Sequence, residues 1–260
     1  MTIDAWVRSL ETLAPLRLAG SWDNVGLLLE GTRSIQRVGL TIDLTEAVVD
    51  ELLEADVDAI VSYHPPIFSG LKRLTEATPR QRSLLRLVRA GVHVYAPHSA
   101  LDAAREGMAD WLLKAFGPVT DVAPIQADAL DPELGAGRWA RLASPCRLQD
   151  LTEGIREHLG LAHLRVAGGP DTVVETLAVC PGAGGSLFAS TQADLLLTGE
   201  MRHHDVLAQV EGGGAVILTD HTNTERGFMT IYAERIRSVC GVEVVVSARD
   251  ADPLRVVSAR

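Results

Sequence analysis

Four short apolar segments of the chain each end in a side chain that could bind a metal ion or accept a proton. These side chains are His64, His98, Glu200 and His221, and the segments are residues 58–64, 91–98, 194–200 and 214–221. Each segment is rich in β-branched residues or leucine and too short for a free-standing helix, so we predict four buried strands. Ligands of open α/β sheets bind at the carboxyl ends of the strands. The four ends are therefore expected to converge on one site, and their nitrogen and oxygen donors indicate a metal site.

The same spacing of imidazole and carboxylate occurs in both halves of the chain. Asp102 lies four residues after His98, and Glu225 lies four residues after His221. Each acid alone could be a helix cap, because Asp102 precedes a predicted helix over residues 103–116 and Glu225 lies in the first turn of another. Two copies after matching strands are better explained as metal ligands. Imidazole and carboxylate without thiolate suit Zn²⁺, Mn²⁺, Fe²⁺, Co²⁺ or Ni²⁺ and do not distinguish among these ions.

Further polar residues surround these candidates. Glu200, His203 and His204 begin a predicted helix, where they could be a solvated turn or part of the site. Their position after a strand favours the site, with Glu200 as a general base for a metal-bound water and the two histidines binding substrate or orienting ligands. The glycine-rich segment 180–186 could hold an anion, but it lacks the Walker lysine, so a tight structural turn is preferred. Residues 21–26 are interpreted as an Asx-type turn next to a buried aromatic side chain.

Helices and strands are predicted to alternate along the chain, which indicates an α/β fold with parallel sheets. The predicted strands are residues 37–42, 58–62, 92–96, 174–179, 195–197, 216–218 and 242–247, and the predicted helices are residues 3–13, 45–55, 79–90, 103–116, 151–159, 185–192, 203–211 and 224–239. An internal duplication is the preferred account of the two halves, although βαβ units look alike generically. Residues 117–137 are rich in Asp, Pro, Ala and Gly and are predicted to form the linker. The expected domains are residues 1–122 with 224–260, and residues 123–223.

Composition limits the classes of function. The 260-residue chain has a formal net charge of −10, which would repel a phosphate backbone, so nucleic acid is an improbable direct partner. No long apolar stretch suggests export or membrane insertion, and a cytoplasmic location is expected. Cys146, Cys180 and Cys240 are far apart in sequence and form no C-x-x-C pair, which indicates reduced thiols that are neither a disulfide framework nor a thiolate metal site.

Five segments together resemble the NIF-three-like metal-binding family, whose bacterial members are often labelled GTP cyclohydrolase 1 type 2 homologues. They are SWDNVGL (residues 21–27), SYHPPIF (62–68), APHSALDAA (96–104), LTGEMRHHD (197–205) and DHTNTERGF (220–228). The resemblance covers nearly the whole chain. It implies two related α/β domains with mostly parallel sheets flanked by helices, a metal site at strand ends between the domains, a toroidal hexamer and a pair of divalent metal ions.

The resemblance also implies a set of ligands. The family's ligands correspond to His64, Asp102, His221 and Glu225, with either carboxylate as a bridge between two ions. Many bacterial relatives have His-His-Pro where this chain has Tyr63-His64-Pro65. Neutral tyrosine is a poor ligand, with a reference pKa of about 10. A second ion would then bind weakly, take water in place of the missing imidazole, or be absent, while Tyr63 and His98 would support the ligands or bind substrate.

Two hypotheses about function follow from the residues and the resemblance. The first is a metal-dependent hydrolase that acts on a purine nucleotide or a related small molecule through a metal-activated water. The second is a non-catalytic metal-binding protein, either a metal-handling factor or a scaffold for protein partners. Glu200 separates the two, because a catalyst should lose turnover on Glu200→Ala and keep its metal.

Overall fold

The computed structural model describes residues 1–257, which divide into two compact units. Unit 1 comprises Met1–His98 and Met229–Arg260, of which residues 258–260 lie outside the described part, and unit 2 comprises Ser99–Phe228. The chain leaves unit 1 within helix α4 (His98–Ala103) and returns at the start of helix α9 (Phe228–Cys240). Within residues 1–257, no helix combines the length and the apolar character needed to cross a membrane.

Unit 1 is built on a five-stranded sheet with the order β1-β4-β3-β2-β13. The strands β2, β3, β4 and β13 run parallel, whereas β1 pairs with β4 in the antiparallel direction. Their bounds are β1 (Gly26–Leu29), β2 (Arg37–Thr41), β3 (Ala59–Ser62), β4 (His93–Ala96) and β13 (Glu243–Val246). Both β3 and β4 are buried along their whole length, as the apolar sequences predict.

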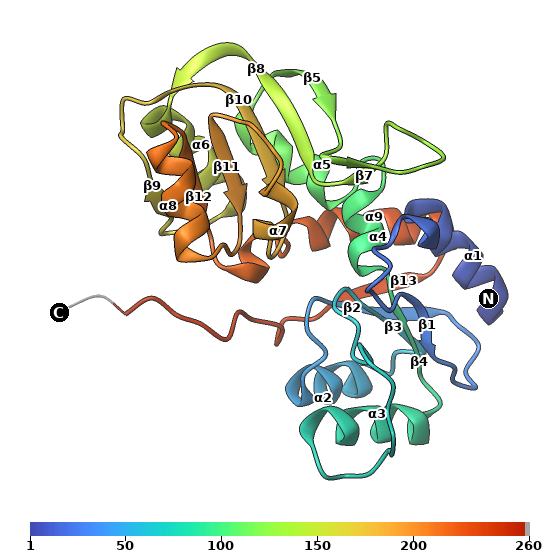
Figure 1. Ribbon diagram of the computed structural model, residues 1–260. Coiled ribbons are helices and arrows are strands. Elements are labelled where there is room, and N and C mark those ends of the chain that lie inside the picture. Colours follow the sequence, from blue (N-terminus) through green and yellow to red (C-terminus); the bar gives the residue numbers. More distant parts are fainter. Residues whose placement is uncertain (258–260) are drawn as a thin grey trace. The chain divides into compact units, whose positions relative to one another are not determined.

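Helices cover both faces of this sheet (Figure 1). The helices α2 (Glu46–Glu54) and α3 (Pro79–Ala90) lie on one face, where Val48, Leu52 and Leu87 pack with Ile60 and Val94. On the other face lie α1 (Ile3–Leu13) and α9 (Phe228–Cys240), and Trp6 of α1 contacts Tyr95 with ring centroids 5.8 Å apart. Thr2, Thr45 and Thr78 cap the starts of α1, α2 and α3 with their hydroxyl oxygens, and these helices begin within one residue of the predicted positions.

Unit 2 is built on a six-stranded mixed sheet with the order β5-β8-β10-β11-β12-β9. The central strands β10, β11 and β12 are parallel, and the antiparallel strands β8 and β9 flank them. The bounds are β5 (Val119–Ala123), β8 (Arg138–Arg147), β9 (Arg165–Ala167), β10 (Val173–Cys180), β11 (Leu195–Thr198) and β12 (Ala215–Leu218). A small pair, β6 (Gln126–Ala127) and β7 (Gly135–Ala136), lies between β5 and β8 in the chain.

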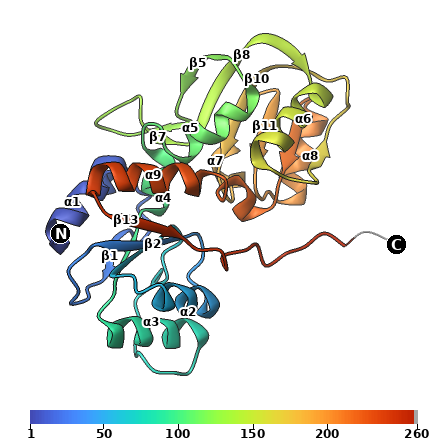
Figure 2. The ribbon, with the colours of Figure 1, turned by 180° about the vertical axis from the view of Figure 1, so that it is seen from behind.

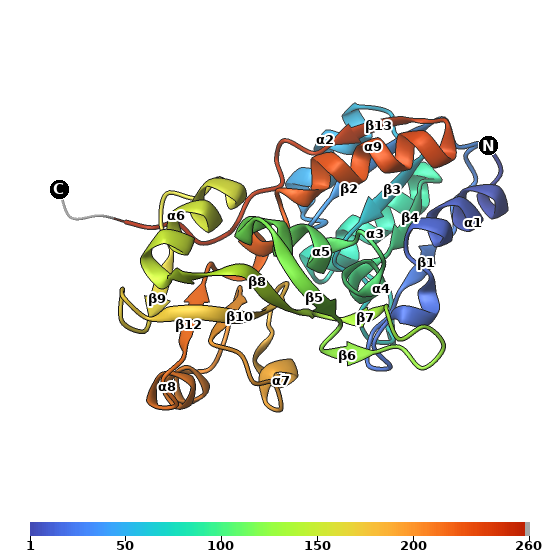
Figure 3. The ribbon, with the colours of Figure 1, turned by 90° about the horizontal axis from the view of Figure 1, so that it is seen from above.

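The helices of unit 2 also cover two faces (Figures 2 and 3). One face carries α5 (Met108–Leu113) and α6 (Leu148–Leu159), and the other carries α7 (Gly185–Phe188) and α8 (His203–Glu211). Phe188 of α7 packs with Ala178, Leu196 and Val216 of the three parallel strands. The α/β class expected from the sequence is therefore confirmed.

Several predicted elements differ from the structure. The helix expected over residues 185–192 already ends at Phe188. The helix expected over residues 103–116 is divided into α4, α5 and the 3-10 turn η2 (Lys114–Phe116), because Glu106 adopts a left-handed φ of 54°. Residues 117–137 are not a structureless linker, since they contain β5, β6 and β7. The helix expected from residue 224 begins only at Phe228, and the 3-10 turn η3 (His221–Thr224) precedes it.

Candidate metal centre

His64 lies just beyond the carboxyl end of β3 in unit 1. Its backbone amide donates to the Ile42 carbonyl at 3.0 Å, and its ring nitrogen Nδ1 is 2.8 Å from Oδ1 of Asp43. A carboxylate at Nδ1 fixes the orientation of an imidazole, and in its neutral form the ring then carries the lone pair on Nε2. This is the arrangement in which a histidine binds a metal ion through Nε2.

His98 follows the neighbouring strand β4 and repeats this arrangement. Its Nδ1 is 2.8 Å from each carboxylate oxygen of Asp23, whose side chain is 0% exposed. His98 also has a positive φ of 32°, which is uncommon for a residue with a side chain and is typical of functional sites. Because β3 and β4 are adjacent and parallel, the rings of His64 and His98 lie close together, with centroids 5.4 Å apart. The buried ring of Tyr63 packs against both imidazoles, with centroid distances of 5.0 and 5.5 Å.

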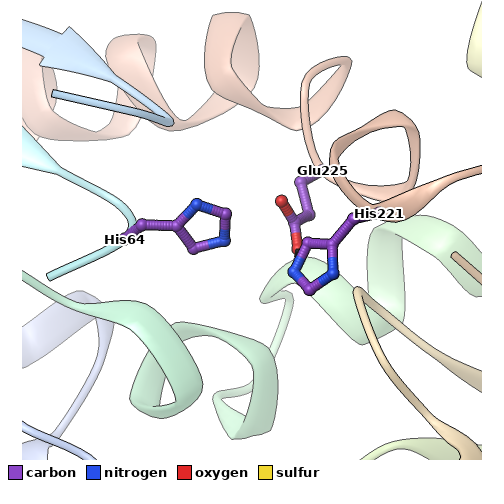
Figure 4. A group of neighbouring side chains, drawn as sticks. All are labelled: His64, His221 and Glu225. Carbon is purple, nitrogen blue, oxygen red and sulfur yellow. Dashed lines mark ion pairs between the residues drawn. The ribbon is translucent and has the colours of Figure 1, made fainter. Parts of the chain in front are cut away.

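His221 and Glu200 form the corresponding pair in unit 2. They follow the adjacent parallel strands β12 and β11, and Oε2 of Glu200 is 3.2 Å from Nδ1 of His221. The other ring nitrogen, Nε2, lies 3.6 Å from Oε1 of Glu225. Figure 4 shows the imidazole of His221 beside the Glu225 carboxylate, and it also draws His64 of unit 1. Glu225 is 1% exposed, and a carboxylate buried to this extent calls for a cationic neighbour or a metal ion.

A glycine makes room for His221 and Glu225. Gly182 has a φ of 62°, and a Cβ atom there would lie 2.9 Å from Nε2 of His221 and 3.1 Å from Oε1 of Glu225. The Gly182 amide donates to the Thr224 hydroxyl at 2.8 Å, and the Thr198 hydroxyl donates to the Gly182 carbonyl at 3.0 Å. The glycine-rich segment is thus the tight turn that the sequence indicates, and it also packs directly against two candidate ligands.

Asp102 lies within α4 and not at the cap that precedes a helix, because α4 already begins at His98. Its carboxylate lies in the same electrostatic neighbourhood as Glu225. Burial raises the pKa of the Cys180 thiol far above its usual value, and the negative charges of Asp102 and Glu225 raise it further.

One feature is common to both units: an acidic side chain holds Nδ1 of each candidate imidazole. The pairs are His64 with Asp43, His98 with Asp23 and His221 with Glu200. The sequence reasoning missed Asp43 and Asp23. Asp43 lies two residues after the end of β2, as His64 and His98 do after β3 and β4, and this signal could have identified it. Asp23 lies in the segment interpreted as only structural, and no periodicity distinguishes it.

His203, His204 and Trp22 are exposed. His203 and His204 are exposed on the first turn of α8, where their rings contact each other with centroids 5.4 Å apart. The sequence interpretation placed a buried aromatic residue next to the turn at residues 21–26. The structure contradicts this expectation for Trp22, which is 63% exposed, because its indole lies on the backbone of the turn itself.

Comparisons with known proteins agree with this architecture. Residues 1–253 match the model of the family Duf34/NIF3 (NGG1p interacting factor 3). The chain is 42% identical to the protein NIF3 homolog of Schizosaccharomyces pombe over 94% of each sequence. It is 38% identical to NIF3-like protein 1 of Drosophila melanogaster over 98% of this chain and 89% of the relative. Its fold matches the crystal structure of a Bacillus cereus protein related to NIF3, with a TM-score of 0.85 and 18% identity over 98% of each chain. The chain therefore belongs to the Duf34/NIF3 family.

Proposed function

We propose that the protein binds one or two divalent metal ions and uses them to hydrolyse a purine nucleotide or a related small molecule. The observation that carries the proposal is the acidic side chain at Nδ1 of His64, His98 and His221, which makes Nε2 the donor atom of each ring. His64, His221 and Glu225 each offer a ligand atom, and this group could hold a metal ion. Asp102 and His98 are the further ligands of the proposed centre.

The donor set fits a hard or borderline divalent cation. It consists of imidazole nitrogens and carboxylate oxygens, which bind Zn²⁺, Mn²⁺, Fe²⁺, Co²⁺ or Ni²⁺. Gly182 leaves the space beside Nε2 of His221 and Oε1 of Glu225 that a side chain would fill. A bound ion of this kind supplies Lewis acidity and lowers the pKa of a coordinated water.

The chain's own residues would hold and orient the reactants. Asp43, Asp23 and Glu200 keep the three imidazoles in place, and the ring of Tyr63 packs against His64 and His98. Glu200 is also the candidate proton acceptor, because its exposed carboxylate is accessible to solvent while it contacts His221. The exposed rings of His203 and His204 are proposed to bind polar groups of the substrate.

Metal binding is tested first, by elemental analysis of the purified protein and by calorimetric titration with Zn²⁺ and Mn²⁺. Glu225→Gln and His64→Ala should each weaken binding by tenfold or more, because each removes a proposed ligand. His163→Ala is the matched control, since His163 is an exposed histidine that should not affect binding. Wild-type protein that binds neither ion, or Glu225→Gln protein that binds as wild type, would contradict the proposal.

The second candidate function is metal binding without catalysis, and the contact between Glu200 and His221 favours it. A carboxylate engaged in orienting a ligand has a structural task that requires no chemistry. Glu200→Gln separates the two functions, because an amide oxygen can still accept from Nδ1–H of His221 but cannot take up a proton. With GTP as the probe, a hydrolase should lose about 10²-fold or more in turnover and keep its metal affinity. A wild-type holoprotein that leaves GTP unchanged would favour the non-catalytic function.

A further inference from the structure

An exposed pair of aromatic rings lies beside His98 in unit 1. Trp22 is 63% exposed and Phe68 is 45% exposed, and their ring centroids are 6.2 Å apart with an interplanar angle of 37°. The indole also meets the His98 imidazole edge to face, with centroids 5.9 Å apart. Burial of an aromatic side chain removes about 150–250 Å² of surface from water, so two rings left exposed side by side offer an apolar face to a binding partner.

The turn that carries Trp22 holds the indole rigidly. The Asp23 amide donates to the Gly20 carbonyl at 2.9 Å, which closes a tight turn around the tryptophan. A Cβ atom on Gly20 would lie 2.5 Å from Nε1 and 2.7 Å from Cε2 of the indole, so only a glycine lets the ring lie this close to the backbone. The backbone therefore supports the indole from one side.

The same turn connects the two rings with His98. Asn24 donates from Nδ2 to the Ile67 carbonyl at 2.5 Å, which ties the turn to the residue just before Phe68. Asp23 of this turn holds Nδ1 of His98 at 2.8 Å. One short segment thus positions an aromatic surface and a proposed metal ligand at the same time. A molecule lying on the rings would have its neighbouring atoms next to His98.

We infer that Trp22 and Phe68 form the surface on which the planar heteroaromatic ring of the substrate stacks. This inference rests on the proposed function, and it specifies the substrate class as molecules with a flat ring, such as purine nucleotides. Stacking on an aromatic side chain tolerates different bases, because every base has a π face. The ring would be held by Trp22 and Phe68 while the group to be hydrolysed lies towards the proposed metal ligands.

Paired ligands provide the test. GMP and ribose 5-phosphate differ by the purine ring, so the Zn²⁺-loaded protein should bind GMP more tightly, and GMP should quench tryptophan fluorescence. Trp22→Ala should weaken GMP binding about tenfold, which corresponds to the lower part of the range known for base stacking, and leave ribose 5-phosphate binding unchanged. Trp22→Phe should keep most of the affinity. Leu130→Ala is the control, because Leu130 is 79% exposed and lies in unit 2.

The outcomes distinguish this inference from the proposed function. Suppose that Zn²⁺ binds normally. The stacking inference is then wrong if Trp22→Ala binds GMP as tightly as wild type does. It is also wrong if wild type binds GMP and ribose 5-phosphate equally or binds neither, and in each case the proposal of metal binding stands. If Trp22→Ala changes only the mass of the assembly in sedimentation, a second copy of the chain covers the rings, which also overturns the inference. If no metal binds, the proposed function fails. Quenching of the Trp22 fluorescence by GMP in the metal-free protein then still tests whether a purine stacks on this ring.

Discussion

At the scale of single residues, the site depends on small groups that hold larger ones in place. His221 and Glu225 fit beside each other only because Gly182 lacks a side chain and adopts a left-handed conformation. Asp220, the residue before His221, also has a positive φ of 67°, and its Oδ1 accepts from Arg165 at 3.2 Å. Strained backbone of this kind persists where the surrounding structure enforces it and is common at functional sites.

Substitution of Gly182 should lower both the stability of the fold and the affinity for metal, and a matched glycine variant separates the two effects. Gly182→Ala is expected to lower the free energy of unfolding by about 1–2 kcal/mol through the left-handed backbone and also to displace His221. Gly160→Ala is the matched control, because Gly160 has a φ of 66° and no atom within 4 Å of an added Cβ. Urea unfolding should show a loss in both variants, whereas calorimetric titration with Zn²⁺ should show weaker binding only for Gly182→Ala. Equal Zn²⁺ affinity in the two variants would show that the space left by Gly182 beside His221 and Glu225 does not matter for metal binding.

At the scale of elements, the parallel strands bring the candidate side chains together in pairs. His64 and His98 follow β3 and β4, and Glu200 and His221 follow β11 and β12. Within each unit the strand ends meet as the sequence predicts, because adjacent parallel strands end at the same edge of a sheet. Because Glu200 follows β11, the register in which β11 pairs with β10 determines where Glu200 lies.

Asp194 anchors the start of β11 to β10. Its Oδ2 accepts from the backbone amides of Glu175 and Thr176 at 3.0 and 2.8 Å and from the Thr176 hydroxyl at 2.9 Å. Burial raises the pKa of Asp194, but these hydrogen bonds lower it more, so the pKa lies below its usual value. A carboxyl group with a depressed pKa stabilises the fold above its unfolded pKa of about 3.9, and this stabilisation is lost as the pH falls through the folded value.

Asp194→Asn should therefore destabilise the protein in a manner that depends on pH. At pH 7 we expect a loss of about 1–3 kcal/mol, the usual value for hydrogen bonds to a charged group. Urea unfolding should show that the difference from wild type shrinks as the pH falls below about 4. Asp171→Asn is the control, since the Asp171 side chain is 82% exposed and should have little effect. A difference that is constant from pH 7 to pH 3 would show that ionisation of Asp194 is not the cause.

At the scale of the whole molecule, the chain forms two α/β units, and each carries imidazoles whose Nδ1 atom is held by a carboxylate. We propose that one centre uses donors of both units, with His64 from unit 1 and His221 and Glu225 from unit 2. The toroidal hexamer implied by the family resemblance and the domain limits expected from the sequence remain predictions.

A shared ion would couple the two units energetically. A ligand that binds only the folded state raises its stability, by about 2.7 kcal/mol at a concentration 100 times its dissociation constant. Zn²⁺ should thus raise the melting temperature of wild type, and His64→Ala and His221→Ala should each abolish most of this increase. The double variant should lose little more than either single variant, because both residues act on the same ion. Strictly additive losses would mean that the units bind metal independently.

The sequence by itself determined the α/β class, the limits of most helices and strands, and the residues at the strand ends. These follow from local periodicity and capping, as α1, α3 and α8 show by ending where predicted. The prediction of one helix over residues 103–116 was wrong, because the left-handed conformation of Glu106 interrupts the helix there. The sequence analysis also did not predict the antiparallel strands β1, β5, β8 and β9, whose pairing partners are distant in the chain.

Only the tertiary structure decided which acid holds which imidazole. Asp43 lies 21 residues from His64, and Asp23 lies 75 residues from His98, so no local spacing relates the members of either pair. The same holds for Gly182 beside His221 and for the exposure of Trp22. Sequence patterns report the burial and the periodicity of single elements, whereas hydrogen bonds between side chains of different elements arise only when the sheet places those elements side by side.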